Sequence, residues 1–223
     1  MKAMILAAGR GERMRPLTDV TPKPLLPVGG KPLIQYHIEG LVAAGTRDIV
    51  INLAWLGSAI RTTLGDGSRF GVRLHYSDEG DHALETGGGI YQALPLLGSE
   101  PFIVVSGDVW SDYPLRWLAS RLAPDDVAHF VMVHNPDYHR RGDFGLREER
   151  IVDDGERLTY ANIGVFTPAF FAGCKPGRFA LAPVMRKHIA QGRVSGELFP
   201  GRWFNIGTPA QLAEIDQLLS KSS

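Results

Sequence analysis

The sequence contains a single cysteine, Cys174, among 223 residues. One cysteine excludes an internal disulfide framework and a cysteine-based zinc site, and it fits a reducing compartment. Long apolar runs are also absent. The first run ends after about six residues, which is too short for a signal peptide, and no stretch approaches the ~20 residues that span a bilayer. We therefore expect a cytoplasmic protein that does not contact a membrane.

The sequence has no excess of charge of either sign, because 24 basic residues balance 24 acidic ones. Without a global positive field, counterion release cannot hold nucleic acid, so no nucleic-acid partner is expected. Any anion must be bound by a local group of residues. Apolar residues make up 44% and charged residues 22%, which is typical of a globular domain.

Strand and helix patterns alternate through the first part of the chain. Predicted strands at 3–7, 48–53, 72–76 and 102–106 alternate with predicted helices at 33–44, 57–64 and 86–97, and the alternation continues to residue 134. Five prolines between residues 16 and 32 argue against regular structure there. This pattern predicts an α/β fold with a mainly parallel sheet covered by helices on both faces. Ligands of such sheets bind at the carboxyl ends of the strands.

The pattern changes after residue 134 to shorter segments. We expect a hairpin at 144–166 that turns at Asp153-Asp154-Gly155, a helix at 179–191, a strand pair near 193–204 and a closing helix from about Pro209. No Pro/Gly/Ser-rich linker interrupts the chain. The sequence therefore predicts one domain over 1–223, with a main body of about 1–134 and a small C-terminal lobe of about 135–223.

Two glycine-containing motifs fail as familiar nucleotide signatures. Gly9 and Gly11 begin like a dinucleotide fingerprint, but Met14 occupies the third glycine position. Gly30-Lys31 is followed by Pro32 where a P-loop needs serine or threonine. Dehydrogenase and kinase functions therefore lose their main support.

The same region nevertheless concentrates groups that bind phosphate. Gly9 and Gly11 let backbone N–H groups approach an anion, Arg13 follows, and Lys23 lies between two prolines that restrict its backbone. Each arginine alone would fit a solvated surface loop about equally well. The combination predicts a triphosphate site.

Residues 6–18, LAAGRGERMRPLT, and residues 21–34, TPKPLLPVGGKPLI, resemble the signature of the sugar-phosphate nucleotidylyltransferase family. Three later segments are similar to further family motifs. LETGGGI at 84–90 resembles the base-binding segment, VSGDV at 105–109 the metal-binding Gly-Asp motif, and WFNIGTP at 203–209 the Trp-x-Asp-x-Gly-Thr-Pro motif. The resemblance covers the chain almost end to end.

This resemblance implies a Rossmann-like, GT-A-like nucleotidyltransferase fold and an enzyme that transfers a nucleoside monophosphate from an NTP to a sugar 1-phosphate. The first part of the chain would bind the nucleotide and the C-terminal lobe the sugar. Mg²⁺ would be the cofactor, and we expect a monomer with no partner beyond its substrates. Both reactants are anions, so catalysis should consist of positioning and charge neutralisation.

The resemblance also implies roles for individual residues. Arg13, Lys23 and Asp108 would be catalytic, and Asp108 and Asn205 would bind the metal. The nucleotide would be bound by Leu6, Ala8, Gly9, Gly11, Glu12, Arg13, Lys23, Glu85, Thr86, Gly87 and Gly88. The sugar would be bound by Gly142, Asp143 and Asn162.

Simpler interpretations exist for two of these segments. Asp108 would also fit a turn at the end of a strand, and Thr86 would also fit a helix N-cap. Three glycines just inside a helix cost about 1 kcal/mol each relative to alanine, which suggests that something approaches the backbone there. The family places the nucleobase at this point.

One residue departs from the family pattern: Asn205 stands where the family has its second metal-binding aspartate. An amide oxygen can ligate Mg²⁺ but adds no negative charge. Asn205 therefore also motivates a different class of function, a regulatory protein that binds sugar nucleotides without turning them over.

Within the family, LETGGGIYQALPLLG, VSGDVWSDY and HRRGDF are most similar to the branch that uses UTP and N-acetylmuramic acid α-1-phosphate in cell-wall (peptidoglycan) recycling. Mannose 1-phosphate guanylyltransferases are the alternative.

Overall fold

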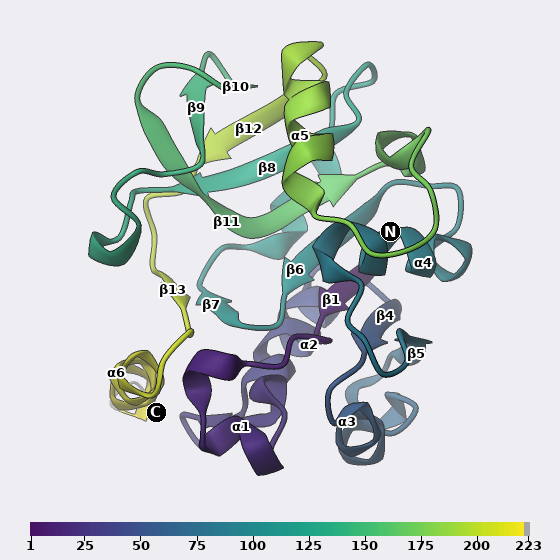
Figure 1. The fold of residues 1–223 in the computed structure, drawn as a ribbon, viewed down its shortest axis with the longest axis vertical. Helices are drawn as coiled ribbons and strands as arrows, with labels where there is room; N and C mark the ends of the chain where they lie inside the picture. The colour runs from purple at the N-terminus through teal and green to yellow at the C-terminus, as the bar shows by residue number, and fades with distance from the viewer. Residues whose placement is uncertain (221–223) are drawn as a thin grey trace.

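A computed structural model describes residues 1–220, and its first part is the predicted alternation of strands and helices (Figure 1). The strands are β1 (Lys2–Leu6), β4 (Asp48–Leu53), β5 (Arg73–Asp78) and β6 (Phe102–Ser106), and the helices are α2 (Leu33–Ala43), α3 (Gly57–Leu64) and α4 (Glu85–Leu97). The predicted helix at 57–64 and the strands at 48–53 and 102–106 are confirmed to the residue. The proline-rich segment holds only short pieces: α1 (Leu17–Val20), a 3-10 turn (Lys23–Leu25), β2 (Pro27–Val28) and β3 (Lys31–Pro32).

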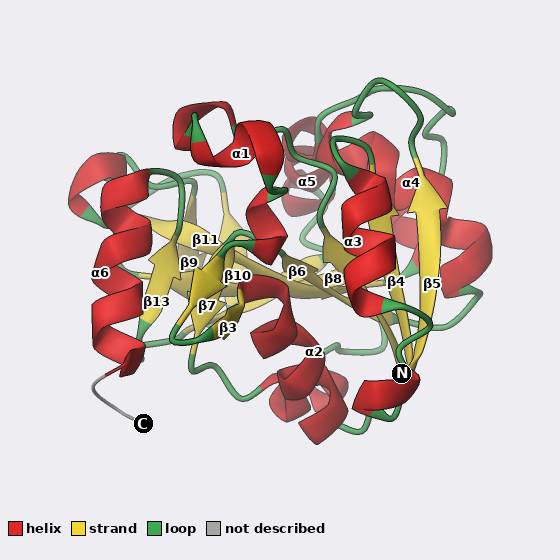
Figure 2. Cartoon of the chain, turned by 90° about the horizontal axis from the view of Figure 1, so that it is seen from below, coloured by secondary structure: helices red, strands yellow, loops and turns green. Residues whose placement is uncertain are grey.

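These four strands pair in parallel in the order β5-β4-β1-β6. Successive side chains point to opposite faces of the sheet, so Ala3 and Ile5 of β1 pack with α2 and α3, whereas Met4 packs with α4. Figure 2 shows α2 on one side of the sheet and α4 on the other. β1, β4 and β6 are buried on both faces, which explains their nearly unbroken apolar runs, whereas the edge strand β5 is partly exposed.

The remaining elements are β7 (Val109–Ser111), β8 (Ala128–Val133), β9 (Phe144–Arg147), β10 (Arg150–Val152), β11 (Arg157–Phe166), α5 (Leu181–Ala190), β12 (Val194–Leu198), β13 (Trp203–Asn205) and α6 (Pro209–Ser220). Five of these strands extend the main sheet into a mixed sheet, and two others, β7 and β13, form a separate two-stranded sheet. The main sheet has nine strands in the order β5-β4-β1-β6-β11-β8-β12-β10-β9, and β9 also pairs with β11. Five strands of the second part therefore close into a small barrel.

The α/β prediction is confirmed, but the expectation of a mainly parallel sheet is wrong beyond β6. The cause is β11, a ten-residue strand that lies antiparallel between β6 and β8. A bulge between Tyr160 and Gly164 shifts its register. Bulges bend strands, so one end of β11 can pair with β6 while the other reaches β9.

The predicted hairpin at 144–166 is wrong in its turn. β9 turns into β10 at Glu148 and Glu149, whose φ angles are 48° and 63°, and Asp153-Asp154-Gly155 instead connects β10 to β11, its neighbour in sequence but not in the sheet. Two positive φ angles are typical of a tight hairpin turn, which usually carries Asn-Gly. Two glutamates give no such signal.

The strand pair near 193–204 is also wrong, because its two strands pair elsewhere. β12 pairs in parallel with β8, whereas β13 pairs antiparallel with β7, directly after Asp108. From there α6 packs on the N-terminal loop in a separate apolar cluster that includes Met14, Trp110 and Ile215. The helix predicted from Pro209 is confirmed as α6, and residues 221–223 of the predicted lobe lie outside the described residues.

Within residues 1–220, no helix is both long and apolar enough to span a bilayer.

Candidate active site

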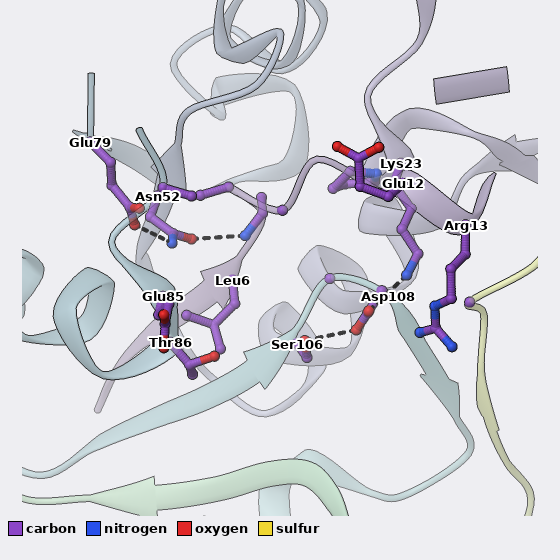
Figure 3. Close-up of a pocket in the computed structure, with 18 residues that line it drawn as sticks. Leu6, Glu12, Arg13, Lys23, Asn52, Glu79, Glu85, Thr86, Ser106 and Asp108 are labelled. Carbon is purple, nitrogen blue, oxygen red and sulfur yellow. Dashed lines mark hydrogen bonds and ion pairs between the residues drawn. The ribbon is translucent and has the colours of Figure 1, made fainter. Parts of the chain in front are cut away.

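A cavity of about 360 Å³ opens at the carboxyl ends of β1, β4 and β6. Figure 3 shows its charged end, with Lys23, Arg13 and Asp108, and an opposite end with Asn52, Glu79, Glu85 and Thr86. Nine of the eleven predicted nucleotide-binding residues line it: Leu6, Ala8, Gly9, Gly11, Glu12, Arg13, Lys23, Glu85 and Thr86. The edge of the sheet predicted from the strand pattern is therefore where these residues meet.

The loop after β1 is held in a fixed shape by contacts with α1. Gly11 has φ of 68°, and a Cβ there would lie 2.9 Å from the Thr18 side chain. The Thr18 hydroxyl donates to the Gly11 carbonyl at 2.9 Å, and Arg10 donates to the Thr18 carbonyl at 2.8 Å. Side-chain bonds from α1 thus fix the loop. Gly9 faces open space, where an added Cβ would meet nothing within 4 Å.

Lys23 forms an ion pair with Asp108 at the charged end. The Nζ–Oδ2 distance is 2.7 Å, and the second Asp108 oxygen accepts from Ser106 at 2.8 Å. The Lys23 side chain is only 10% exposed, because a 3-10 turn in the proline segment folds it inward. Burial raises the pKa of the Asp108 carboxyl, but Lys23 and Ser106 together lower it further, to below its usual value. Asp108 is therefore ionised at neutral pH.

Arg13 lies where the two halves of the chain meet. A Cβ on Gly207 would lie 2.9 Å from Arg13 Nη2, so the segment after β13 passes close beside the guanidinium. The Ile206 N–H donates to the Asp108 carbonyl at 2.8 Å and holds this segment beside Asp108. The segments around residues 13, 108 and 205 thus come together from three distant parts of the sequence.

A second cavity of about 650 Å³ adjoins the first and shares Arg13, Glu85 and Thr86 with it. Its other lining residues come from the segment at 138–144, from β11, from the first part of α5 with the residue before it, and from β13, and they include Asp143, Asn162 and Asn205. Asp143 accepts from the Tyr160 N–H at 2.9 Å and contacts His139 at 3.1 Å. Asn162 lies in the β11 bulge with φ of 56°.

Gly142 is not among the residues that line either cavity. Its φ is +59°, and a Cβ there would lie 2.8 Å from the Asn135 side chain. Gly142 therefore shapes the turn that positions Asp143.

Asn52 and Glu79 are among the lining residues that were not predicted from the sequence. Asn52 accepts from the Ala7 N–H at 2.8 Å and donates to Glu79 at 2.6 Å, and Glu79 accepts from the Leu84 N–H at 2.7 Å. This chain of bonds ties the loop after β1 to the start of α4. The only signal for it in the sequence is one amide within the buried, otherwise apolar run at 49–53 of β4, since a buried amide needs partners.

Gly87 and Gly88 pack against the segment at 177–179, and their predicted contact with a nucleobase stays a prediction. Neither glycine lines the cavity, and what approaches their backbone is the protein itself. A Cβ on Gly87 would lie 2.5 Å from the Phe179 ring, and one on Gly88 would lie 2.3 Å from the Gly177 carbonyl oxygen. The Gly88 N–H already donates to the Phe179 carbonyl at 3.1 Å. Thr86 is not the N-cap either, because α4 begins at Glu85.

We expect Gly88→Ala to lower the free energy of unfolding by about 1–3 kcal/mol, because the added methyl group must displace backbone. Gly9→Ala is the matched control, with open space at the same atom, and its stability should stay within about 0.5 kcal/mol of the parent. Chemical denaturation of the three proteins measures both values. Equal midpoints and slopes for Gly88→Ala and the parent would contradict the packing role.

Metal ligands in the described part of the chain are sparse, since residues 1–220 contain no group of three His, Cys, Asp or Glu side chains that could hold an ion. Asp108 lines the first cavity and has oxygen lone pairs beyond its two hydrogen bonds, whereas Asn205 lines the second cavity and carries an amide oxygen on β13, which pairs with the strand directly after Asp108. One carboxylate with neutral oxygens suits Mg²⁺, which completes its shell with water and substrate phosphates. This donor set fits a nucleotide-borne magnesium ion.

Residues 2–222 match the family model described as nucleotidyl transferase. The chain belongs to the nucleotidyl transferase family. The N-acetylmuramate alpha-1-phosphate uridylyltransferase of Neisseria meningitidis serogroup B is 50% identical over 98% of each chain. The protein of the same name from Caulobacter vibrioides is 36% identical and covers 95% of this nucleotidyl transferase and 94% of that protein.

The fold of this nucleotidyl transferase also matches a solved structure. UDP-glucose pyrophosphorylase, crystallised with UDP-glucose, superposes with a TM-score of 0.82 at 21% identity over 100% of this chain and 99% of that one. At this identity the match shows the fold alone. It confirms the α/β nucleotidyltransferase fold.

Proposed function

We propose that the protein transfers UMP from UTP to N-acetylmuramic acid α-1-phosphate, releasing pyrophosphate and forming UDP-N-acetylmuramic acid. The observation that carries this proposal is the pair of adjoining cavities, one lined by the glycine loop and the other by the β-barrel side, with Arg13 shared between them. A reaction that joins a nucleotide to a sugar phosphate needs this arrangement. The 50% identity to the Neisseria enzyme supports the choice of substrates.

The proposed reaction asks little covalent chemistry of the protein. An oxygen of the sugar phosphate attacks the α-phosphorus of UTP, a new P–O bond forms, and the bond to the β-phosphate bridging oxygen breaks so that pyrophosphate leaves with its electron pair. Negative charge shifts onto the leaving group. Lys23 and Arg13, at the charged end of the first cavity, are preorganised to neutralise that charge.

The two ends of the first cavity suggest how UTP lies. We propose that backbone N–H groups of the loop at Gly9–Gly11 bind the phosphates, with Leu6, Ala8 and Glu12 lining this side. The base would then lie at the opposite end, near Glu85 and Thr86. The division into a nucleotide part of about 1–134 and a sugar part from about 135 onward follows, with β13 returning to the first part.

Asp108 and Asn205 would hold Mg²⁺ against the phosphates. When bound, the ion would supply positive charge at the α-phosphate. The role of the protein's own residues is to orient it: Ser106 fixes one Asp108 oxygen, and Lys23 holds the other.

Asp143 and Asn162 would bind sugar hydroxyls in the second cavity.

UTP and N-acetylmuramic acid α-1-phosphate are cytoplasmic metabolites, so we propose the cytoplasm as the compartment of the protein. We also propose that the protein is a monomer.

Pyrophosphate release from four NTPs, each with several sugar 1-phosphates, tests the proposal. We expect UTP with N-acetylmuramic acid α-1-phosphate to give the highest kcat/KM. Preference for GTP with mannose 1-phosphate would favour the guanylyltransferase alternative. Binding of UTP with no turnover of any pair would favour a regulatory protein, although such a protein has no need of both Arg13 and Lys23.

A further inference from the structure

The proposed acceptor carries two anionic groups at different places. Besides the 1-phosphate, N-acetylmuramic acid has a carboxylate, on a lactyl ether at O3, that N-acetylglucosamine lacks. Recognition of that carboxylate rests on the proposed function, and it requires a residue of the protein that faces the acceptor. A carboxylate that leaves water needs a cationic or hydrogen-bonding partner.

The second cavity is lined by two arginines, Arg13 and Arg186. Arg13 borders both cavities, and in the proposed function it lies beside the phosphates. The lining histidine, His139, contacts Asp143 at 3.1 Å. Glu85, a lining carboxylate, is paired with Arg178 at 3.0 Å. Besides Arg13, Arg186 is the second arginine of the lining, and its carboxylate partner, Asp153, is not a lining residue.

Arg186 is positioned by packing. It follows Met185 on α5, and its guanidinium lies over the buried ring of Phe144, with Cζ 5.2 Å from the ring centroid. Leu181 and Met185, on the preceding turns of the same helix, form the apolar wall beside it. An apolar wall next to a cation suits a lactyl group, which has a methyl and a carboxylate on one carbon.

The guanidinium can bind a ligand without breaking a strong interaction. Among the hydrogen bonds of residues 1–220, Arg186 makes one, from Nε to Asp153 at 3.2 Å, which leaves both Nη atoms available. The two side chains are 46% and 43% exposed, and such exposed pairs contribute little to stability. Asp153 also lies 3.5 Å from Arg157, so it keeps a cationic neighbour if Arg186 turns away.

We propose that Arg186 binds the lactyl carboxylate of the acceptor and selects N-acetylmuramic acid α-1-phosphate over N-acetylglucosamine 1-phosphate. Guanidinium presents parallel N–H groups that match a carboxylate. The contact lies away from the reacting phosphorus, so it strengthens substrate and transition state alike and acts on KM more than on kcat.

The test compares both sugar phosphates in the parent, Arg186→Gln and Lys187→Gln. Lys187 is the next residue on α5, exposed and outside the cavity lining, so its variant should behave like the parent. Arg186→Gln should raise KM for N-acetylmuramic acid α-1-phosphate about 10- to 100-fold, as expected for a hydrogen bond to a charged group, and change kcat/KM for N-acetylglucosamine 1-phosphate less than about twofold. Arg186→Lys should recover part of the loss.

A substrate analogue completes a double-mutant cycle between Arg186 and the lactyl carboxyl group. When the lactyl carboxyl is converted to its methyl amide, the parent should lose the same factor, and Arg186→Gln should lose almost nothing more. Equal losses for the two sugars in Arg186→Gln, or no loss for either, would overturn the assignment. A parent that does not use N-acetylmuramic acid α-1-phosphate at all would instead contradict the proposed function, so the two failures are distinguishable.

Discussion

Lys23→Ala is expected to lower kcat/KM for UTP at least about 100-fold, and Arg13→Ala to do the same. Each change removes a preorganised positive charge that acts mainly in the transition state, where negative charge shifts toward the leaving pyrophosphate. The fold should survive, because the Asp108 side chain is 36% exposed and water can solvate it when Lys23 is absent. Pyrophosphate release and circular dichroism measure the two outcomes.

Lys31→Ala is the matched control for this prediction. Lys31 pairs with Glu39 and lies outside both cavities, so its loss should leave turnover unchanged. A purified Lys23→Ala protein that turned over UTP at the parent rate would show that the phosphate site lies elsewhere.

Asp108→Asn should leave almost no activity, whereas Asn205→Asp should raise kcat and lower the Mg²⁺ concentration needed for half-maximal activity. Asp108 is the one carboxylate of the proposed donor set, so its loss leaves only neutral oxygens for the metal. A carboxylate at position 205 adds negative charge beside it, because β13 pairs with the strand that directly follows Asp108.

Stability without metal gives a second measurement of the same pair. In Asn205→Asp two carboxylates would face one site, repel each other and raise the pKa of one, so this variant should unfold at a lower temperature than the parent unless Mg²⁺ is present. Titrating Mg²⁺ against pyrophosphate release compares the parent with both variants. Identical Mg²⁺ dependence in the parent and Asn205→Asp would mean that residue 205 does not touch the metal.

Short sequence patterns predicted the helices and parallel strands of the first part of the chain well. The helix at 57–64 and the strand at 48–53 have their predicted bounds because a glycine or a change of hydrophobic period marks each end. The glycine loop and Asp108 could likewise be expected at one edge of the sheet, since parallel strands bring their carboxyl ends together.

Features set by distant contacts could not be predicted in this way. The position of β11 depends on pairing with β6, β8 and β9, and no local pattern encodes those partners. The neighbours of Gly87 and Gly88 could not be predicted from a local pattern either. Their sequence signals a close approach to the backbone, but only the structure shows that the segment at 177–179 packs against them.

The return of β13 to β7 has a consequence for how the protein matures. Synthesis proceeds from the amino end, so a growing chain can form the parallel strands and the glycine loop long before residues 203–207 exist. Until they arrive, Asp108 lacks the segment that bonds to its carbonyl, and Arg13 lacks the neighbour that passes beside it. A ligand stabilises only the state that binds it, so the contacts that the returning segment adds at Asp108 and Arg13 can contribute to binding of UTP and metal only after that segment has been made. A chain interrupted before β13 therefore keeps most of the residues that line the first cavity but lacks these late contacts.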